Sequence, residues 1–423
     1  MTIEHIAITN FKGIDKETTF QLCPITIFIG ANSSGKSSVL HSIAALSQTL
    51  KLGNTLPSLV LDSEYAHVHL GRFVEIAHSN SYDDSICIAL DLGPIDLEAT
   101  LPEGEAHIKG PCYVRYEFRC NRRTQEVYIS SADFDVGGNT AKIIRSKNSP
   151  YKFYCTTNSS DQSFEVERRN NISFMPIISK ERGVNQDLLG LFVFLSAVQQ
   201  KIERALRSTC YLGPFRQSPL RRYPFRGSSA SEVGAQGEAT ITLLASEYSR
   251  SKGKAHQKQI NGWLASMGLA KAVGLSRVGT SDLLDVTLTL DDGEKLPIAD
   301  LGYGLSQVLP VLTQCSYATK GSTLLFEQPE LHLHEKAAKK LSGIFIESAT
   351  KRGLQLIIET HSRDLVNGVF DGIRSGSIDA NEVALYRVDR IDKASRYKRI
   401  SINFDGAHLD VDDPWADAVQ GTP

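Results

Sequence analysis

The chain has 423 residues, of which 41% are hydrophobic and 22% charged, so its composition is that of an ordinary globular protein with two lobes or one large insertion. A net charge of −2 argues against a surface coated in positive charge, and any contact with nucleic acid would be local or made by an oligomer. No apolar run approaches the ~20 residues of a membrane span, and the first ten residues lack the apolar core of a signal peptide. Seven scattered cysteines without a C-x-x-C pair indicate a reducing, cytoplasmic location.

Two short strands are predicted before the first recognisable motif. Ile3, Ile6 and Ile8 alternate with polar residues, which is the pattern of a half-buried strand. A turn follows at Asn10-Phe11-Lys12-Gly13, and a second strand is expected over residues 18–22.

The next stretch carries a nucleotide-binding pattern. Residues 25–29 are apolar and rich in β-branched side chains, which predicts a buried strand, and residues 37–46 have helical spacing without proline. Between them lies Gly30-Ala31-Asn32-Ser33-Ser34-Gly35-Lys36-Ser37, which fits the P-loop pattern G-x-x-x-x-G-K-[ST] without mismatch. Strand, glycine loop and helix is the context that this motif requires.

In such a loop, glycines let successive N–H groups point inward around a phosphate, and the following helix adds its positive end. We expect Lys36 to reach the β- and γ-phosphates and the Ser37 hydroxyl to bind Mg²⁺. Ser38, the next residue, is counted with the binding loop.

Residues 82–175 have a different character. Segments 86–90, 113–118 and 126–129 alternate or run apolar between turn signals, which predicts an antiparallel β region. Helices are expected over residues 186–206, 238–249 and 260–267, with a strand over residues 284–290. We therefore expect four parts: an N-terminal part with the P-loop (1–80), a β-rich region (81–180), a helical lobe (181–275) and a C-terminal part (276–423).

A cluster of basic residues interrupts the helical lobe. Its members, interleaved with aromatic side chains, are Arg216, Arg221, Arg222 and Arg226. Arginines so placed suit contacts to the phosphates of a nucleic acid or a nucleotide. A solvated loop with aromatic residues packed beneath it explains the same pattern equally well.

Three further segments complete a pattern of motifs. Residues 301–307 place glycines and a serine before a helical run, which makes an anion site or a plain helix cap. Residues 322–330 predict an apolar strand that ends in Glu327, Gln328 and Glu330, as a Walker B motif needs in order to hold the Mg²⁺ shell. Residues 354–362 predict another strand, which ends at His361, a side chain that can sense a γ-phosphate and orient water.

The order of these motifs resembles the ABC-type ATPase heads of the RecF, Rad50 and structural-maintenance-of-chromosomes (SMC) group. Residues 327–334 and 211–214 are more similar to the compact OLD-like bacterial ATPases, among them those of the Septu and PARIS anti-phage defence systems. The resemblance spans nearly the whole chain. It implies an α/β P-loop NTPase fold, an ABC-type ATPase head with an antiparallel β region and a helical lobe.

This resemblance implies ATP and Mg²⁺ as ligands and a homodimer or higher homo-oligomer in which two heads sandwich two ATP molecules. Lys36, Ser37 and Glu327 would hold Mg·ATP, and His361 would be the switch histidine. The P-loop of one subunit would face the signature of the other, formed by Gly304, Ser306 and Gln307. The turn after the first strand, with Asn10, Phe11 and Lys12, would lie near the base of the nucleotide.

Two departures from the family pattern matter. Glu327 stands at the Walker B aspartate position and Gln328 at the position of the catalytic glutamate, and an amide cannot act as a general base. We therefore expect slow hydrolysis and a long-lived ATP-bound dimer, unless Glu330 is the base.

The second departure concerns nuclease chemistry. OLD enzymes carry a TOPRIM nuclease after the head, whereas we expect a short, strand-rich tail after His361 whose acids do not assemble such a site. These acids are Asp379, Glu382, Asp389, Asp392 and Asp405. The expectation is an ATPase without nuclease chemistry, paired with a separately encoded effector such as a TOPRIM or HNH nuclease.

Two functions stay open on this basis. The first is the sensor or regulatory ATPase of a bacterial anti-phage defence system that controls the effector nuclease. The second is a RecF-like DNA-repair ATPase that forms an ATP-gated DNA clamp. A lasting complex with a toxic neighbour favours the first, and tight, salt-sensitive DNA binding by the protein alone favours the second.

Overall fold

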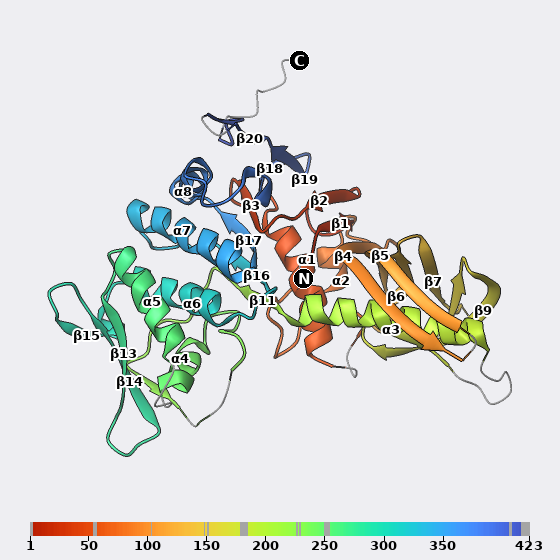
Figure 1. Cartoon of the computed structure of the whole chain (residues 1–423), viewed down its shortest axis with the longest axis horizontal. Helices are drawn as coiled ribbons and strands as arrows, with labels where there is room; N and C mark the ends of the chain where they lie inside the picture. Colours follow the sequence, from red (N-terminus) through yellow and green to blue (C-terminus); the bar gives the residue numbers. More distant parts are fainter. Residues whose placement is uncertain are drawn as a thin grey trace. The chain divides into compact units, whose positions relative to one another are not determined.

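The computed structural model describes residues 3–53, 57–102, 104–147, 149, 152–177, 185–225, 227, 230–248, 254–405 and 408–415. The chain forms two compact units, each built from segments that are far apart in the sequence (Figure 1). The first unit comprises Met1–Leu22, Ser33–Thr209 and Arg390–Arg396, and the second comprises Cys23–Asn32, Cys210–Asp389 and Tyr397–Pro423. The four-part division expected from the sequence stays a prediction.

The first unit is built on a nine-stranded sheet in the order β10-β9-β8-β7-β6-β5-β4-β1-β2, in which neighbouring strands run antiparallel. The antiparallel β region predicted for residues 82–175 is thereby confirmed, and the two N-terminal strands extend it. The strands are β1 His5–Thr9, β2 Thr18–Gln21, β4 Ile86–Leu101, β5 Gly104–Cys120, β6 Val127–Val136, β7 Asn139–Arg145, β8 Phe153–Thr157, β9 Ser160–Asn170 and β10 Ser173–Pro176.

One helix covers part of this sheet. α3 (Gln186–Arg207) begins where the Asn185 side chain accepts a hydrogen bond from the Leu188 N–H, and it lies along β4 and β5 (Figure 1). Its buried side chains recur at helical spacing, so the apolar face meets the alternating inner face of the strands. The unit also contains α1 (Ser37–Lys51), which follows the P-loop as predicted, and the short α2 (Phe73–Ile76).

The second unit contains the sheet that positions the motifs. Its order is β11-β16-β17-β3-β18-β19, and β16, β17, β3 and β18 run parallel. Because both faces of such a sheet are covered, the predicted strands are nearly continuous apolar runs. The strands are β3 Ile25–Gly30, β11 Thr209–Leu212, β16 Thr323–Glu327, β17 Gln355–Thr360, β18 Val383–Ile391 and β19 Ala394–Ile400.

The helices of this unit pack on the same sheet and on a smaller one of the order β12-β14-β13, with β15 beside β14. The helices are α4 Thr240–Tyr248, α5 Ala255–Ser266, α6 Tyr303–Tyr317, α7 Glu335–Arg352 and α8 Arg363–Arg374, with 3₁₀ turns η1 Ile298–Asp300 and η2 Ala380–Glu382. The strands of the smaller sheet are β12 Arg222–Pro224, β13 Ala272–Arg277, β14 Leu283–Thr289 and β15 Lys295–Pro297. β20 Ile402–Phe404 and β21 Leu409–Val411 pair with each other in a separate two-stranded sheet.

The expectation of a strand-rich tail after His361 was wrong at its start, because α8 occupies that stretch. Gly368 and Gly372 weaken the helical pattern in the sequence. In the structure they allow close packing on α7, since an added Cβ would collide with Ser342 and Ile346 respectively. Across the described residues, none of the helices has both the length and the hydrophobicity that crossing a membrane would take.

Candidate functional site

The predicted motifs of the second unit converge at one edge of its sheet. β16 and β3 flank β17 in parallel register, so the carboxyl ends of all three strands meet there. Ligands of open α/β sheets bind at this edge. A cleft of about 620 Å³ lies beside it and is lined by Asn32, Gln328, Glu330 and His361, among others. The structure therefore brings together the third residue of the P-loop, the end of the Walker B segment and the predicted switch histidine.

Glu327 ends β16 and is only 6% exposed. The Tyr211 hydroxyl donates a 2.8 Å hydrogen bond to its Oε1 atom. Burial, followed by the charge of Glu327, raises the pKa of Tyr211, so the hydroxyl keeps its proton and remains a donor. Tyr211 comes from β11, the neighbour of β16 in the sheet. Sequence reasoning gave it no role, because a tyrosine at the end of a short apolar run does not reveal its partner.

A tight turn follows Glu327 and carries the other two Walker B residues. Gln328 has a left-handed backbone (φ 45°) and donates its N–H to the Glu359 carbonyl at 2.8 Å. Glu330 Oε1 accepts hydrogen bonds from Thr360 Oγ1 at 2.5 Å and from the His361 N–H at 3.3 Å. Its Oε2 is buried and has no hydrogen-bond partner among the residues that the structure describes. Burial raises the pKa of Glu330, so this carboxyl holds its proton to a higher pH than usual.

The structure contradicts the prediction that Arg216 contacts a nucleic acid. The side chain is 8% exposed, and its guanidinium faces inward. It donates to the carbonyl oxygens of Gln307 at 3.2 Å, Glu327 at 3.1 Å and Gln328 at 3.0 Å. Burial lowers its pKa to about 10, which still leaves it protonated at neutral pH. Through these three carbonyls Arg216 joins the start of α6 to the end of β16. Its hydrogen bonds are therefore used within the fold and not for phosphates.

The other members of the arginine cluster differ from Arg216. Arg221 is exposed and forms a bidentate pair with Asp300, with N–O distances of 2.6 and 3.2 Å. Arg222, in β12, lies 3.6 Å from Asp285 and is also exposed. Arg226 lies outside the described residues. Among the described members of this cluster, Arg221 and Arg222 are therefore exposed, whereas Arg216 is buried.

The predicted signature forms the start of α6 and packs against the Walker B turn of the same chain. A Cβ added to Gly304 would lie 2.5 Å from the His332 carbonyl oxygen, so only glycine fits. The Ser306 hydroxyl donates to the Tyr303 carbonyl at 2.8 Å, and Gln307 is buried. His334 lies directly before α7, and its side chain accepts a hydrogen bond from the Lys336 N–H as the N-terminal cap of that helix.

The P-loop has the backbone that its motif predicts. Positive φ angles occur at Gly30 (150°), Ser33 (61°) and Gly35 (107°), and α1 follows Lys36 without a side-chain cap. Ser34 is 2% exposed, and its Oγ has no hydrogen-bond partner among the described residues. A buried polar atom without a partner, next to a helix N-terminus, fits a loop that receives a phosphate oxygen. The remaining predicted binding residues of the loop are Ala31, Asn32, Ser37 and Ser38.

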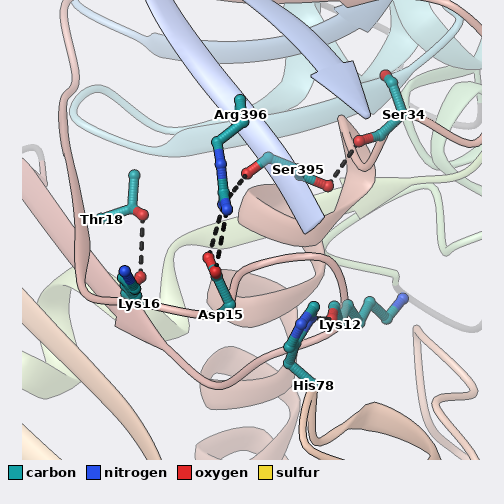
Figure 2. A network of polar contacts seen from close by, with 8 residues as sticks. All are labelled: Lys12, Asp15, Lys16, Thr18, Ser34, His78, Ser395 and Arg396. Atoms are coloured by element: carbon teal, nitrogen blue, oxygen red, sulfur yellow. Dashed lines mark hydrogen bonds and ion pairs between the residues drawn. The ribbon is translucent and has the colours of Figure 1, made fainter. Parts of the chain in front are cut away.

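The first turn is held mainly by its own unit. Asn10 donates to the Ser85 carbonyl at 3.0 Å and accepts from the Ser79 N–H at 2.9 Å, so its amide is used to fix a loop. Phe11 is fully buried. Lys12 contacts His41 of α1 through its ammonium group, and its carbonyl lies 2.9 Å from Nδ1 of His78 (Figure 2). Of the three residues predicted to lie near the base, Lys12 is the one with a charge.

Two protein-family models match the chain. Residues 1–183 match the model described as "AAA ATPase domain", and residues 213–367 match the one described as "AAA domain, putative AbiEii toxin, Type IV TA system". No curated protein matches the chain.

Among solved structures, the chain is similar to several SMC heads. The head domain from Thermotoga maritima is 10% identical with a TM-score of 0.42, over 95% of this chain and all of that one. An SMC head bound to the C-terminal winged-helix domain of ScpA is 12% identical (TM-score 0.47; 95% and 98% covered). A head with an extended coiled coil, bound to the C-terminal domain of ScpA from Pyrococcus furiosus, is also 12% identical (0.49; 95% and 96%).

The family matches agree with the architecture. The P-loop follows β3, a central parallel strand, and β16, which ends in Glu327, lies two positions away in the sheet. His361 directly follows β17, the strand between them. The chain therefore has the α/β architecture of a P-loop ATPase with an added antiparallel sheet, and two separate parts of it match models of AAA domains.

Proposed function

We propose that this chain binds Mg·ATP at its P-loop and hydrolyses it slowly, as a nucleotide-dependent dimerisation switch. The observation that carries the proposal is the gathering of Asn32, Gln328, Glu330 and His361 around one cleft at the edge where the P-loop begins. In this proposal Lys36 binds the β- and γ-phosphates, while Ser37 and Glu327 offer the oxygen ligands that Mg²⁺ prefers. The bound metal would supply charge stabilisation at the phosphates.

The residues of the cleft support a slow reaction. Gln328 stands where the family has its base, and its amide cannot accept a proton from water. Glu330 is the nearby carboxyl, but Thr360 and the His361 N–H both occupy one of its oxygens. His361 would orient water or sense the γ-phosphate from the end of β17. A slow reaction leaves the ATP-bound state populated for long, which suits a switch better than a motor.

The dimer is proposed from the signature segment. The N-terminus of α6, with Gly304, Ser306 and Gln307, offers backbone N–H groups and the positive end of a helix to an anion. Tyr303, in the same turn, is 61% exposed. In the proposed assembly this face meets the nucleotide of a second copy.

Light scattering with and without Mg·ATP tests the switch, with Lys36→Ala as the control. We expect ATP to raise the mass of the wild-type protein to that of a dimer or larger assembly, and the variant to show no such step. A mass that is already large and does not respond to ATP would contradict the switch and indicate a constitutive scaffold.

We further propose that the switch belongs to a bacterial anti-phage defence system and controls a separately encoded effector nuclease, with no nuclease chemistry of its own. The toxin–antitoxin wording of the family model over residues 213–367 is in keeping with this role. The alternative is a RecF-like, ATP-gated DNA clamp, to which Arg221 and Arg222 would contribute. Salt-dependent DNA binding by the purified protein would favour the clamp, and a stable complex with a co-expressed neighbouring gene product would favour the defence role.

A further inference from the structure

The segment Arg390–Arg396 donates hydrogen bonds to two backbone carbonyls of the P-loop. The Ser395 hydroxyl donates a 2.6 Å hydrogen bond to the Ser34 carbonyl (Figure 2). Arg390 donates to the Ser33 carbonyl at 3.1 Å. All four residues belong to the first compact unit, in which Arg390–Arg396 comprises the end of β18, the turn after it and the start of β19. We call this segment the P-loop brace.

The planar peptide bond gives these two contacts a consequence for the phosphate side of the loop. In a trans peptide the C=O of one residue points opposite to the N–H of the next. A fixed Ser33 carbonyl therefore turns the Ser34 N–H away from the brace, and a fixed Ser34 carbonyl does the same for the Gly35 N–H. Ser33 also has a left-handed φ of 61°, a conformation that is unfavourable for a residue with a Cβ and needs such support.

The brace is itself docked by a close backbone contact. The Ser395 N–H donates to the Gly13 carbonyl at 2.7 Å, and a Cβ at Gly13 would collide with the Ser395 hydroxyl. Because Gly13 has no Cβ, there is room for the Ser395 hydroxyl in the position from which it donates to the Ser34 carbonyl.

The neighbouring Arg396 forms a bidentate pair with Asp15 and donates a long hydrogen bond of 3.4 Å to the Ser395 carbonyl, so its printed partners lie outside the P-loop (Figure 2). The arginine lowers the pKa of Asp15 to about 2, so the pair stays ionised at neutral pH. Because the pair is largely exposed, it should add little stability. Arg396 thus provides a matched control within the same segment.

We propose that Ser395 and Arg390 are positioning residues that hold the N–H groups of Ser34 and Gly35 in the orientation that receives the phosphates of the nucleotide. The inference rests on the proposed binding of Mg·ATP at this loop. It assigns a role in nucleotide affinity to a segment that lies more than 350 residues after the P-loop. It also explains the glycine at position 13, where a Cβ would displace the Ser395 hydroxyl.

The test is the affinity of the purified full chain for the fluorescent analogue mant-ATP with Mg²⁺. Ser395→Ala and Arg390→Ala each remove one hydrogen bond to a loop carbonyl and should weaken binding about 3- to 10-fold. Gly13→Ala should do the same from the other side, because it displaces the Ser395 hydroxyl. Arg396→Ala should bind like the wild type, and Ser395→Thr, which keeps the hydroxyl, should restore most of the affinity.

The outcomes separate this inference from the proposed function. If wild type binds mant-ATP and Lys36→Ala does not, but Ser395→Ala and Arg390→Ala bind as tightly as Arg396→Ala, the positioning role is refuted while the ATPase stands. If wild type itself fails to bind, the proposed function fails first. Because Arg390 is exposed, its variant should fold even where Ser395→Ala does not, and equal melting temperatures without nucleotide would exclude a general loss of stability.

Discussion

Arg216 offers the sharpest test of the architecture around Glu327. Arg216→Ala removes the three hydrogen bonds to the carbonyls of Gln307, Glu327 and Gln328. Each such bond contributes a net ~1 kcal/mol, so the free energy of unfolding should fall by about 3 kcal/mol. For a folding unit of roughly 150–250 residues, this corresponds to a melting temperature lower by about 6–12 °C.

A matched control is available a few residues away. Arg221→Ala removes an exposed pair with Asp300, and exposed pairs contribute about 0–1 kcal/mol. Arg216→Lys keeps a positive charge but loses the planar group that spans three carbonyls, so it should fall between wild type and Arg216→Ala. Thermal melts of the three variants in one buffer, followed by steady-state ATP turnover, check both stability and function.

The result that would refute the reasoning is a melt of Arg216→Ala that coincides with that of Arg221→Ala. It would mean that the buried guanidinium costs as much to desolvate as its carbonyl contacts return. Loss of turnover without loss of stability would instead show that Arg216 acts only on the geometry of the Walker B turn.

Three further predictions concern the signature and the Walker B turn. Gly304→Ala should destabilise the protein by about 1–3 kcal/mol, because its Cβ would lie 2.5 Å from the backbone oxygen of His332, whereas Gly302→Ala, with no atom within 4 Å, should be neutral in the same melt. Glu330→Gln should stabilise the protein near neutral pH but not below pH 4.5, the ordinary pKa of a glutamate. The pKa of Glu330 is raised in the folded state, so the wild type loses stability as the pH rises from 4.5 through that raised value, whereas glutamine does not titrate. Urea melts near neutral pH and below pH 4.5 would show no such difference if the carboxyl were not buried. Gln328→Glu should raise single-turnover hydrolysis at least about tenfold, since a general base contributes roughly 10²–10⁴, and an unchanged rate would point to Glu330 as the base.

The strands and loops of the site could be predicted because their signals are local. A parallel strand covered on both faces has a buried, continuous apolar centre, and β3, β16 and β17 each meet that description. The P-loop adds glycines at Gly30 and Gly35 where the backbone takes positive φ angles. Neither property depends on which distant segment the strand or loop will meet.

The environment of single side chains could not be predicted in this way. Arginines and aromatic residues in one loop look alike in the sequence whether they are exposed, as Arg221 is, or buried, as Arg216 is. The difference is made by carbonyls that lie about 90 to 110 residues away along the chain. The same holds for Ser395, whose partner Ser34 is 361 residues away, and for Tyr211, whose partner is Glu327.

Tyr211, in β11, and Arg216, in the loop after it, give the segment of residues 211–216 a structural role that its composition did not suggest. Within six residues it holds the carboxylate of Glu327, the carbonyl of the same residue and, through Gln307, the first turn of α6. A change in the position of the signature turn must therefore alter contacts that also hold the end of the Walker B strand. Residues that share partners in this way do not act independently, so variants of the signature and of the Walker B turn should combine non-additively by roughly 0.5–3 kcal/mol. Such coupling is what the proposed switch requires, because engagement of the signature would then affect Glu327, the carboxylate that we propose as a ligand of Mg²⁺.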